Sequence, residues 1–92
     1  MRKLVPAEIR TACAGLPQWR RKGAAITRDF EFDDFLAAMK FVNAVARAAE
    51  KACHHPDIDV RWNKVTLTLS THDAGGLTAK DFALAAKCDA LA

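Results

Sequence analysis

The three histidines of the chain stand at two places where they could carry acid–base chemistry. His54 and His55 are adjacent in the segment "KACHHPD", and His72 lies further along in "STHDAGG". An unperturbed imidazole titrates near pH ~6.5, so it can donate or accept a proton close to neutrality. A pocket that holds two or more imidazoles suits a reaction in which one proton is delivered and another is removed. The residues therefore predict a proton-transfer site if the fold brings the two segments together.

Two other interpretations of the same residues stay open at this level. Residue types that bind zinc occur at four positions, Cys53, His54, His55 and His72. However, consecutive helical side chains diverge by about 100°, so three contiguous ligands converge poorly on one ion. The other interpretation is an ordinary helix end, because histidine suits the negative end of the helix dipole and proline often follows a helix stop. That interpretation leaves His72 unexplained.

The element that must position His54 and His55 is a long helix, predicted over residues 33–52 with the sequence DDFLAAMKFVNAVARAAEKA. Asp33 or Asp34 can cap its N-terminus, and Pro56 prevents it from continuing. Apolar residues at helical spacing form two stripes: Phe35, Met39, Val42, Ala46 and Ala49, and Phe41, Ala44, Val45 and Ala48. This surface exceeds what one small sheet can cover, so it predicts an oligomer interface.

The other elements are strands and two further helices. Alternation of apolar and polar residues predicts strands over 25–32, 59–62 and 65–71, and a two-residue turn at Asn63-Lys64 joins the last two. Trp19 is expected on a strand that pairs with 25–32. Helices are predicted over 6–15, and after Thr78, whose capping box Asp81 completes. The order helix, two strands, helix, two strands, helix predicts an α+β fold, a four-stranded antiparallel sheet with three helices on one face.

Composition limits the class of protein. The 92 residues suffice for one domain, residues 1–92, and 51% hydrophobic with 27% charged residues is typical of a globular chain. A net charge of +3 is mild, so direct nucleic-acid binding is not expected. The odd set Cys13, Cys53 and Cys88 favours reduced thiols and a cytoplasmic location. Since no apolar run reaches about 18 residues, no membrane span is expected.

The segment "EKACHHPDIDVRWNKVTLTLSTHDAGGLTAKD" resembles the pterin-4a-carbinolamine dehydratase family. The pattern that carries the resemblance runs through seven positions at fixed spacing: Glu50, His54-His55-Pro56, Trp62, His72 and Asp81. The upstream part is similar too, from Trp19 through "ITRDFEFDDF" to the long helix, so the resemblance spans nearly the whole chain. One departure is Cys53, which stands where the animal members have an aspartate.

The resemblance implies dehydration of a 4a-hydroxytetrahydropterin to the quinonoid dihydropterin and water, which recycles the cofactor of aromatic amino-acid hydroxylases. His54 and His72 would be the acid–base pair, and His55 would mainly bind and orient the pterin. The remaining implied substrate-binding residues are Trp19, Glu50, Pro56, Ser70, Thr71, Asp73 and Asp81. Glu50 and Asp81 could also be partners of the imidazoles. A solvated charge is an equally good explanation for Glu50, and the helix cap is at least as good a one for Asp81.

The resemblance further implies that no metal or other cofactor takes part, since the pterin is the substrate. It also implies a homodimer or homotetramer assembled through the long helix. Some members of the family instead act as dimerisation partners of transcription factors or as assembly factors, so a binding protein is the alternative function. Intact His54, His55 and His72 favour the enzyme, because a purely structural role does not require them.

Overall fold

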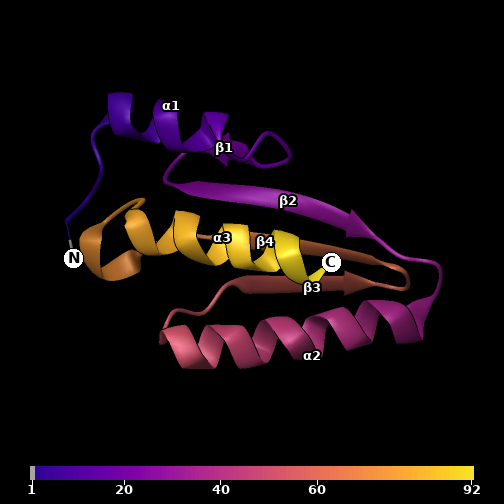
Figure 1. Cartoon of the computed structure of the whole chain (residues 1–92). Helices are drawn as coiled ribbons and strands as arrows, with labels where there is room; N and C mark the ends of the chain where they lie inside the picture. Colours follow the sequence, from indigo (N-terminus) through magenta and orange to yellow (C-terminus); the bar gives the residue numbers. More distant parts are fainter. Residues whose placement is uncertain (1) are drawn as a thin grey trace.

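The computed structural model describes residues 2–92 as three α-helices, one short 3₁₀ helix and four β-strands (Figure 1). The α-helices are α1 (Pro6–Ala14), α2 (Phe35–Ala52) and α3 (Ala79–Leu91), and the 3₁₀ helix is η1 (His72–Ala74). The strands are β1 (Arg20–Lys22), β2 (Ala25–Glu31), β3 (Asp57–Arg61) and β4 (Lys64–Leu69). Their order along the chain confirms the predicted α+β fold.

The sheet is antiparallel throughout, with the strand order β1-β2-β4-β3. Residues that face each other across β2 and β4 include Ile26 with Leu69 and Phe30 with Val65, and all four are buried. Their side chains share one face because directly opposed residues point the same way. The helices cover this face (Figure 1). Burial of the alternating apolar residues thus sets the pairing register.

The turn between β3 and β4 lies one residue earlier than the sequence predicted. Arg61 pairs with Lys64, so the two turn residues are Trp62 and Asn63. Trp62 has a φ of 53° and is 66% exposed, so it belongs neither to a strand nor to the core. Asn63 is engaged elsewhere, since its side-chain amide donates to the Phe32 carbonyl at 2.8 Å. The tertiary contact of Asn63 therefore places the less suitable Trp62 at positive φ.

Both ends of α2 are capped locally. The Asp34 carboxylate accepts the Ala37 N–H at 2.8 Å, which selects Asp34 over Asp33 as the N-cap. At the other end Cys53 is left-handed with φ 51°, and the His54 N–H donates to the Ala49 carbonyl at 3.1 Å. This is a Schellman-type stop, in which a left-handed residue turns the chain away from the helix axis. The stop directs His54 back toward the sheet.

Cys53→Gly is expected to stabilise the protein by about 0.5–1 kcal/mol, because glycine occupies the left-handed region without steric cost. Cys53→Ala is the matched control. It removes the thiol but keeps the Cβ, so its stability should stay close to wild type. Urea unfolding followed by circular dichroism measures both. A glycine variant no more stable than the alanine variant would contradict the left-handed conformation.

The two predicted stripes of α2 have different environments. Ala38, Phe41, Val45 and Ala49 face the core and are buried. Met39 and Val42 are only half-buried and Ala46 is exposed, and Phe35 at the start of this stripe is 47% exposed. The stripe of Phe35, Met39, Val42 and Ala46 is therefore left largely uncovered along one flank of α2.

The helix α3 runs antiparallel to α2 across the sheet (Figure 1). Thr78 caps it: the Thr78 side chain accepts the Lys80 N–H at 3.3 Å, and the Asp81 carboxylate accepts the Thr78 N–H at 2.9 Å. This confirms the predicted capping box. Near the other end Cys88 is fully buried, and burial raises the pKa of its thiol to about 11, so Cys88 packs as a neutral apolar group.

Candidate active site

A cavity of about 230 Å³ lies between the end of α2 and the segment that leaves β4. Its lining residues come from these two places alone and are Cys53, His54, His55, Ser70, Thr71, His72 and Asp73. The fold thus brings the three histidines, which come from two distant segments, to one cavity. The reason is the strand order, because β4 and the end of α2 both reach the same end of the sheet (Figure 1).

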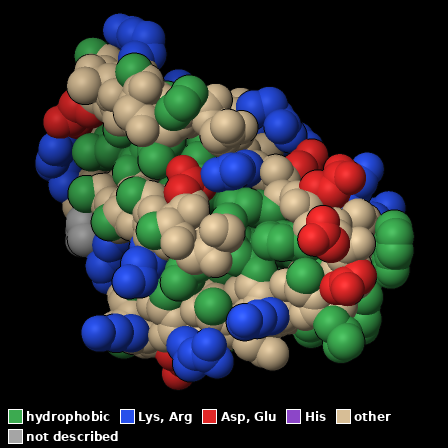
Figure 2. Space-filling model, turned by 45° about the vertical axis from the view of Figure 1, so that its right-hand side comes forward, with side chains coloured by type: hydrophobic (Ala, Val, Ile, Leu, Met, Phe, Trp, Pro, Cys, Tyr) green, Lys and Arg blue, Asp and Glu red, His purple; other side chains and the backbone are tan. Residues whose placement is uncertain are grey.

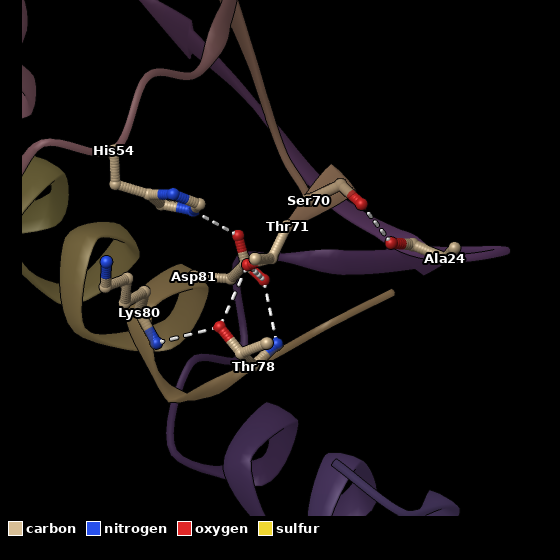
Figure 3. A network of polar contacts seen from close by, with 7 residues as sticks. All are labelled: Ala24, His54, Ser70, Thr71, Thr78, Lys80 and Asp81. Carbon is tan, nitrogen blue, oxygen red and sulfur yellow. Dashed lines mark hydrogen bonds and ion pairs between the residues drawn. The ribbon is translucent and has the colours of Figure 1, made fainter. Parts of the chain in front are cut away.

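His54 is held by a buried carboxylate. Its Nε2 lies 2.6 Å from Oδ1 of Asp81, the His54 residue is 9% exposed, and Asp81 is fully buried (Figure 3). The other carboxylate oxygen, Oδ2, accepts the Thr71 hydroxyl at 2.8 Å and the Thr78 N–H at 2.9 Å. Asp81 is therefore both the helix cap and the partner of an imidazole, so the two explanations left open by the sequence hold together.

The hydrogen atoms of this network can be assigned from donor counts. The single hydroxyl hydrogen of Thr71 goes to Asp81, so the 2.9 Å contact between Thr71 and Thr78 must use the hydrogen of Thr78. These counts make Oδ2 of Asp81 an acceptor from two donors. Treating Asp81 as a carboxylate makes Oδ1 an acceptor too, and this assigns the hydrogen of His54 to Nε2. In the neutral ring, Nδ1 keeps its lone pair and can accept a proton.

The other two histidines are more accessible. His55 is exposed, and its Nε2 lies 2.6 Å from Oε1 of Glu50, so Glu50 pairs with His55 rather than with His54. His72 begins η1 and is exposed beside Asp73. Neither ring is fixed by a buried partner within the described residues 2–92. Their positions suit groups that meet a ligand from the solvent side of the cavity.

The floor of the cavity is fastened to the sheet. The Ser70 hydroxyl donates to the Ala24 carbonyl at 2.7 Å, which ties the end of β4 to the turn between β1 and β2 (Figure 3). Thr71 follows as a buried residue whose N–H donates to the Gly76 carbonyl at 3.1 Å. These bonds hold the segment that carries His72 in place relative to α2.

Trp19 does not line this cavity. It precedes β1 and is 5% exposed in the core, edge-on to Phe30 with ring centroids 6.1 Å apart. Its indole N–H donates to Oδ1 of Asp89 at 2.9 Å, and Asp89 lies about two turns along α3 from Asp81. The expectation that Trp19 packs beside a bound ring is therefore corrected, because the indole is sealed in the core by a partner near the end of the chain. Pro56 is half-buried next to His55 but is also absent from the lining.

Two residues of the site were not identified by the sequence-based prediction. Cys53 lines the cavity, although the resemblance had marked it only as a departure from the family pattern. Thr78 was predicted only as a cap, and the structure adds its bond to Thr71. The capping-box spacing of Thr78 and Asp81 was the signal available, since it brings the two side chains together at the first turn of α3.

Within residues 2–92, the described side chains form no group of three or more histidine, cysteine or acidic residues arranged to hold a metal ion. Among the same residues, none of the helices has the length and apolar character needed to cross a membrane.

Comparison with known proteins places the chain in a family. Residues 2–91 match the family model described as pterin 4 alpha carbinolamine dehydratase. The chain belongs to the pterin-4a-carbinolamine dehydratase family. A relative from Acidobacterium capsulatum is 55% identical over 99% of both chains. A relative from Gloeobacter violaceus is 52% identical and covers 94% of this chain and 98% of its own. Both are named, provisionally, as pterin-4-alpha-carbinolamine dehydratases.

Solved structures of pterin dehydratase relatives share the fold. A crystal structure from Brucella melitensis, described as a transcriptional coactivator/pterin dehydratase, superposes with a TM-score of 0.95 at 38% identity over 99% of both chains. A second structure, a pterin dehydratase-like protein identified as a RuBisCO assembly factor in the alpha-carboxysome, has a TM-score of 0.69 at 28% identity. It covers 80% of this chain and 88% of its own. The fold therefore occurs in relatives described by different roles.

Proposed function

We propose that this protein dehydrates a 4a-hydroxytetrahydropterin to the quinonoid dihydropterin and water. The observation that supports this most is that His54, His55 and His72 line one cavity, while Oδ1 of the buried Asp81 lies 2.6 Å from Nε2 of His54. The 230 Å³ cavity is small, but it is open to solvent on the side of His72 and Asp73, which are exposed. A flat pterin ring would extend out of it at that side.

The reaction needs two proton transfers. The C4a–O bond breaks as an acid protonates the hydroxyl, which leaves as water, and the C4a=N5 double bond forms as a base removes the proton from N5. We assign this acid–base pair to His54 and His72, with His54 using Nδ1. Because the two rings come from different segments, His54 just after α2 and His72 in η1, either histidine can serve as acid according to the face that carries the hydroxyl.

The other residues bind and orient the ring in this proposal. His55, which Glu50 holds at 2.6 Å, would contact the pterin from the mouth of the cavity. The hydroxyl of Ser70 and the carboxylate of Asp73 would meet its polar edge, since the pterin presents amide and amine groups there. Thr71 contributes through Asp81, because its only hydroxyl hydrogen is used in that bond. No cofactor takes part in this scheme, since the pterin is the substrate.

The test of the proposal is a dehydration assay on the wild-type protein. A 4a-hydroxytetrahydropterin is generated in the cuvette by a phenylalanine hydroxylase, and its conversion is followed by absorbance with and without the protein. We expect acceleration in proportion to enzyme concentration. Conversion no faster than in buffer that contains an equal amount of albumin would refute the enzyme.

A binding protein is the second candidate, and the uncovered stripe of α2 favours it. Phe35, Met39, Val42 and Ala46 leave an apolar flank that an oligomer or another protein would cover. We propose that this flank assembles a homodimer or homotetramer. Relatives described as a coactivator or an assembly factor make a partner role the alternative. Three results together would favour that alternative. The protein would sediment as a monomer, show no dehydration activity, and recover one stoichiometric partner from its source cells.

A further inference from the structure

A second cavity, of about 320 Å³, opens between α2 and α3 on the other side of His54. Its floor consists of small or apolar side chains, Ala48, Ala52, Ala83 and Leu84, and three lysines, Lys51, Lys80 and Lys87, stand around it. The volume falls within the range of small-molecule sites, about 300–1,000 Å³. His54 is the one residue that lines both this cavity and the histidine cavity.

The lysines around this cavity lack carboxylate partners because every acidic residue of the two helices is engaged elsewhere. Glu50, the acid of α2, is held by His55, and Asp81 is held by His54 and Thr71. Asp89, the remaining acid of α3, pairs with Arg28 at 2.6 Å. Within residues 2–92 no carboxylate lies within 4.0 Å of the three ammonium groups or among the lining residues. The cavity therefore combines an apolar floor with uncompensated positive charge.

The position of Lys80 is further evidence that the cavity suits an anion. It lies in the first turn of α3, where the helix dipole disfavours a cation, so the helix itself gives no reason for a lysine there. Figure 2 shows blue Lys and Arg side chains gathered at the lower left and along the bottom, where α2 lies beside the start of α3, with green apolar side chains between them. An anion at this place would gain from the lysines and from the positive end of α3 together.

The uncovered stripe of α2 does not reach this cavity. At 100° per residue, Met39, Val42 and Ala46 lie on one flank of α2, whereas Ala48 and Lys51 lie on roughly the opposite flank, beside α3. Oligomer assembly through the stripe would therefore leave the cavity open to a ligand.

We propose that the cavity between α2 and α3 binds a small organic anion, with an apolar body on the alanine floor and a phosphate or carboxylate between Lys51, Lys80 and Lys87. The ligand is separate from the dehydration substrate, because the His54 ring stands between the two cavities. This proposal depends only on the three lysines and the apolar floor, so a test of it does not depend on whether the protein dehydrates a pterin.

The test is a titration of the full-length protein with phenyl phosphate, followed by two-dimensional ¹H–¹⁵N NMR. We expect saturable shifts centred on Lys51, Ala52, Lys80 and Lys87, with a Kd of about 1 mM or tighter. Benzyl alcohol keeps the aromatic body without the charge, and inorganic phosphate keeps the charge without the body. Both should bind at least about fivefold more weakly.

Lysine variants sharpen the result. Lys51→Gln with Lys87→Gln should weaken phenyl phosphate about thirtyfold, because each of the two lost ammonium groups contributes about 1 kcal/mol of Coulomb attraction in water. Lys40→Gln is the matched control, since Lys40 lies on α2 outside this cavity, and it should change the Kd by less than about twofold. The proposal is overturned if the shifts do not saturate, if they centre on His72, or if inorganic phosphate binds as tightly as phenyl phosphate. A titration with an acidic peptide is the remaining comparison, and the proposal is also overturned if this peptide saturates the site whereas phenyl phosphate does not.

Discussion

His54→Ala is expected to lower kcat/KM for dehydration by about 10²–10⁴-fold, the usual contribution of a positioned acid or base. His54 and Thr71 both line the cavity and bond the buried carboxylate of Asp81, and of these two His54 is the one that can exchange a proton near neutrality. His72→Ala should cause a loss of similar size, since the second proton transfer is assigned to that ring. Single-turnover absorbance measurements with a pterin generated in the cuvette give both values.

His55→Ala is the internal control for this prediction. The His55 ring is exposed and bonded to Glu50, so its removal should raise KM by less than about tenfold and leave kcat nearly unchanged. Circular dichroism and sedimentation show whether each variant keeps its fold and assembly. Equal losses for all three variants would contradict the division of roles, and full activity of His54→Ala would remove His54 from the chemistry.

Asp81→Asn is expected to lower kcat by about 10²-fold or more while the protein stays folded. The two donors that meet Oδ2, the Thr71 hydroxyl and the Thr78 N–H, require an acceptor there, so the amide oxygen of asparagine would take that place. The amide nitrogen would then face His54 and donate to Nε2. The neutral imidazole would have to carry its hydrogen on Nδ1, which is the nitrogen assigned to proton transfer in the proposed reaction.

The tautomer itself can be measured. Ring ¹⁵N shifts of His54 should report hydrogen on Nε2 in the wild type and on Nδ1 in Asp81→Asn, and a merely structural role of Asp81 would leave the tautomer unchanged. Unfolding in urea should show a loss of about 1–3 kcal/mol for Asp81→Asn, and more for Asp81→Ala, which leaves several buried donors unpaired. Thr78→Ser, which keeps the hydroxyl, should retain nearly full activity, whereas Thr78→Val should lose part of it.

Local patterns were sufficient for most of the elements. The alternation around Phe30 predicted β2, and the Thr78 and Asp81 spacing predicted the start of α3, because each depends on side chains close together in the sequence. The β3–β4 turn was misplaced for the same reason. Asn63 is locally the better residue for positive φ, but its side chain bonds Phe32, so the left-handed position falls on Trp62.

The sequence by itself determined which three imidazoles are available for chemistry. It also determined where α2 ends, next to two of them, and the order of helices and strands. These follow from residue types, caps and periodicity, all of which act over a few neighbouring residues. Only the tertiary structure decided that Asp81 holds His54, that Glu50 holds His55, and that Trp19 is sealed in the core by Asp89. The Asp81 and Asp89 contacts join residues 27 and 70 positions apart. Such pairs depend on how strands and helices stack, because burial leaves a polar group only the partners that packing brings within reach.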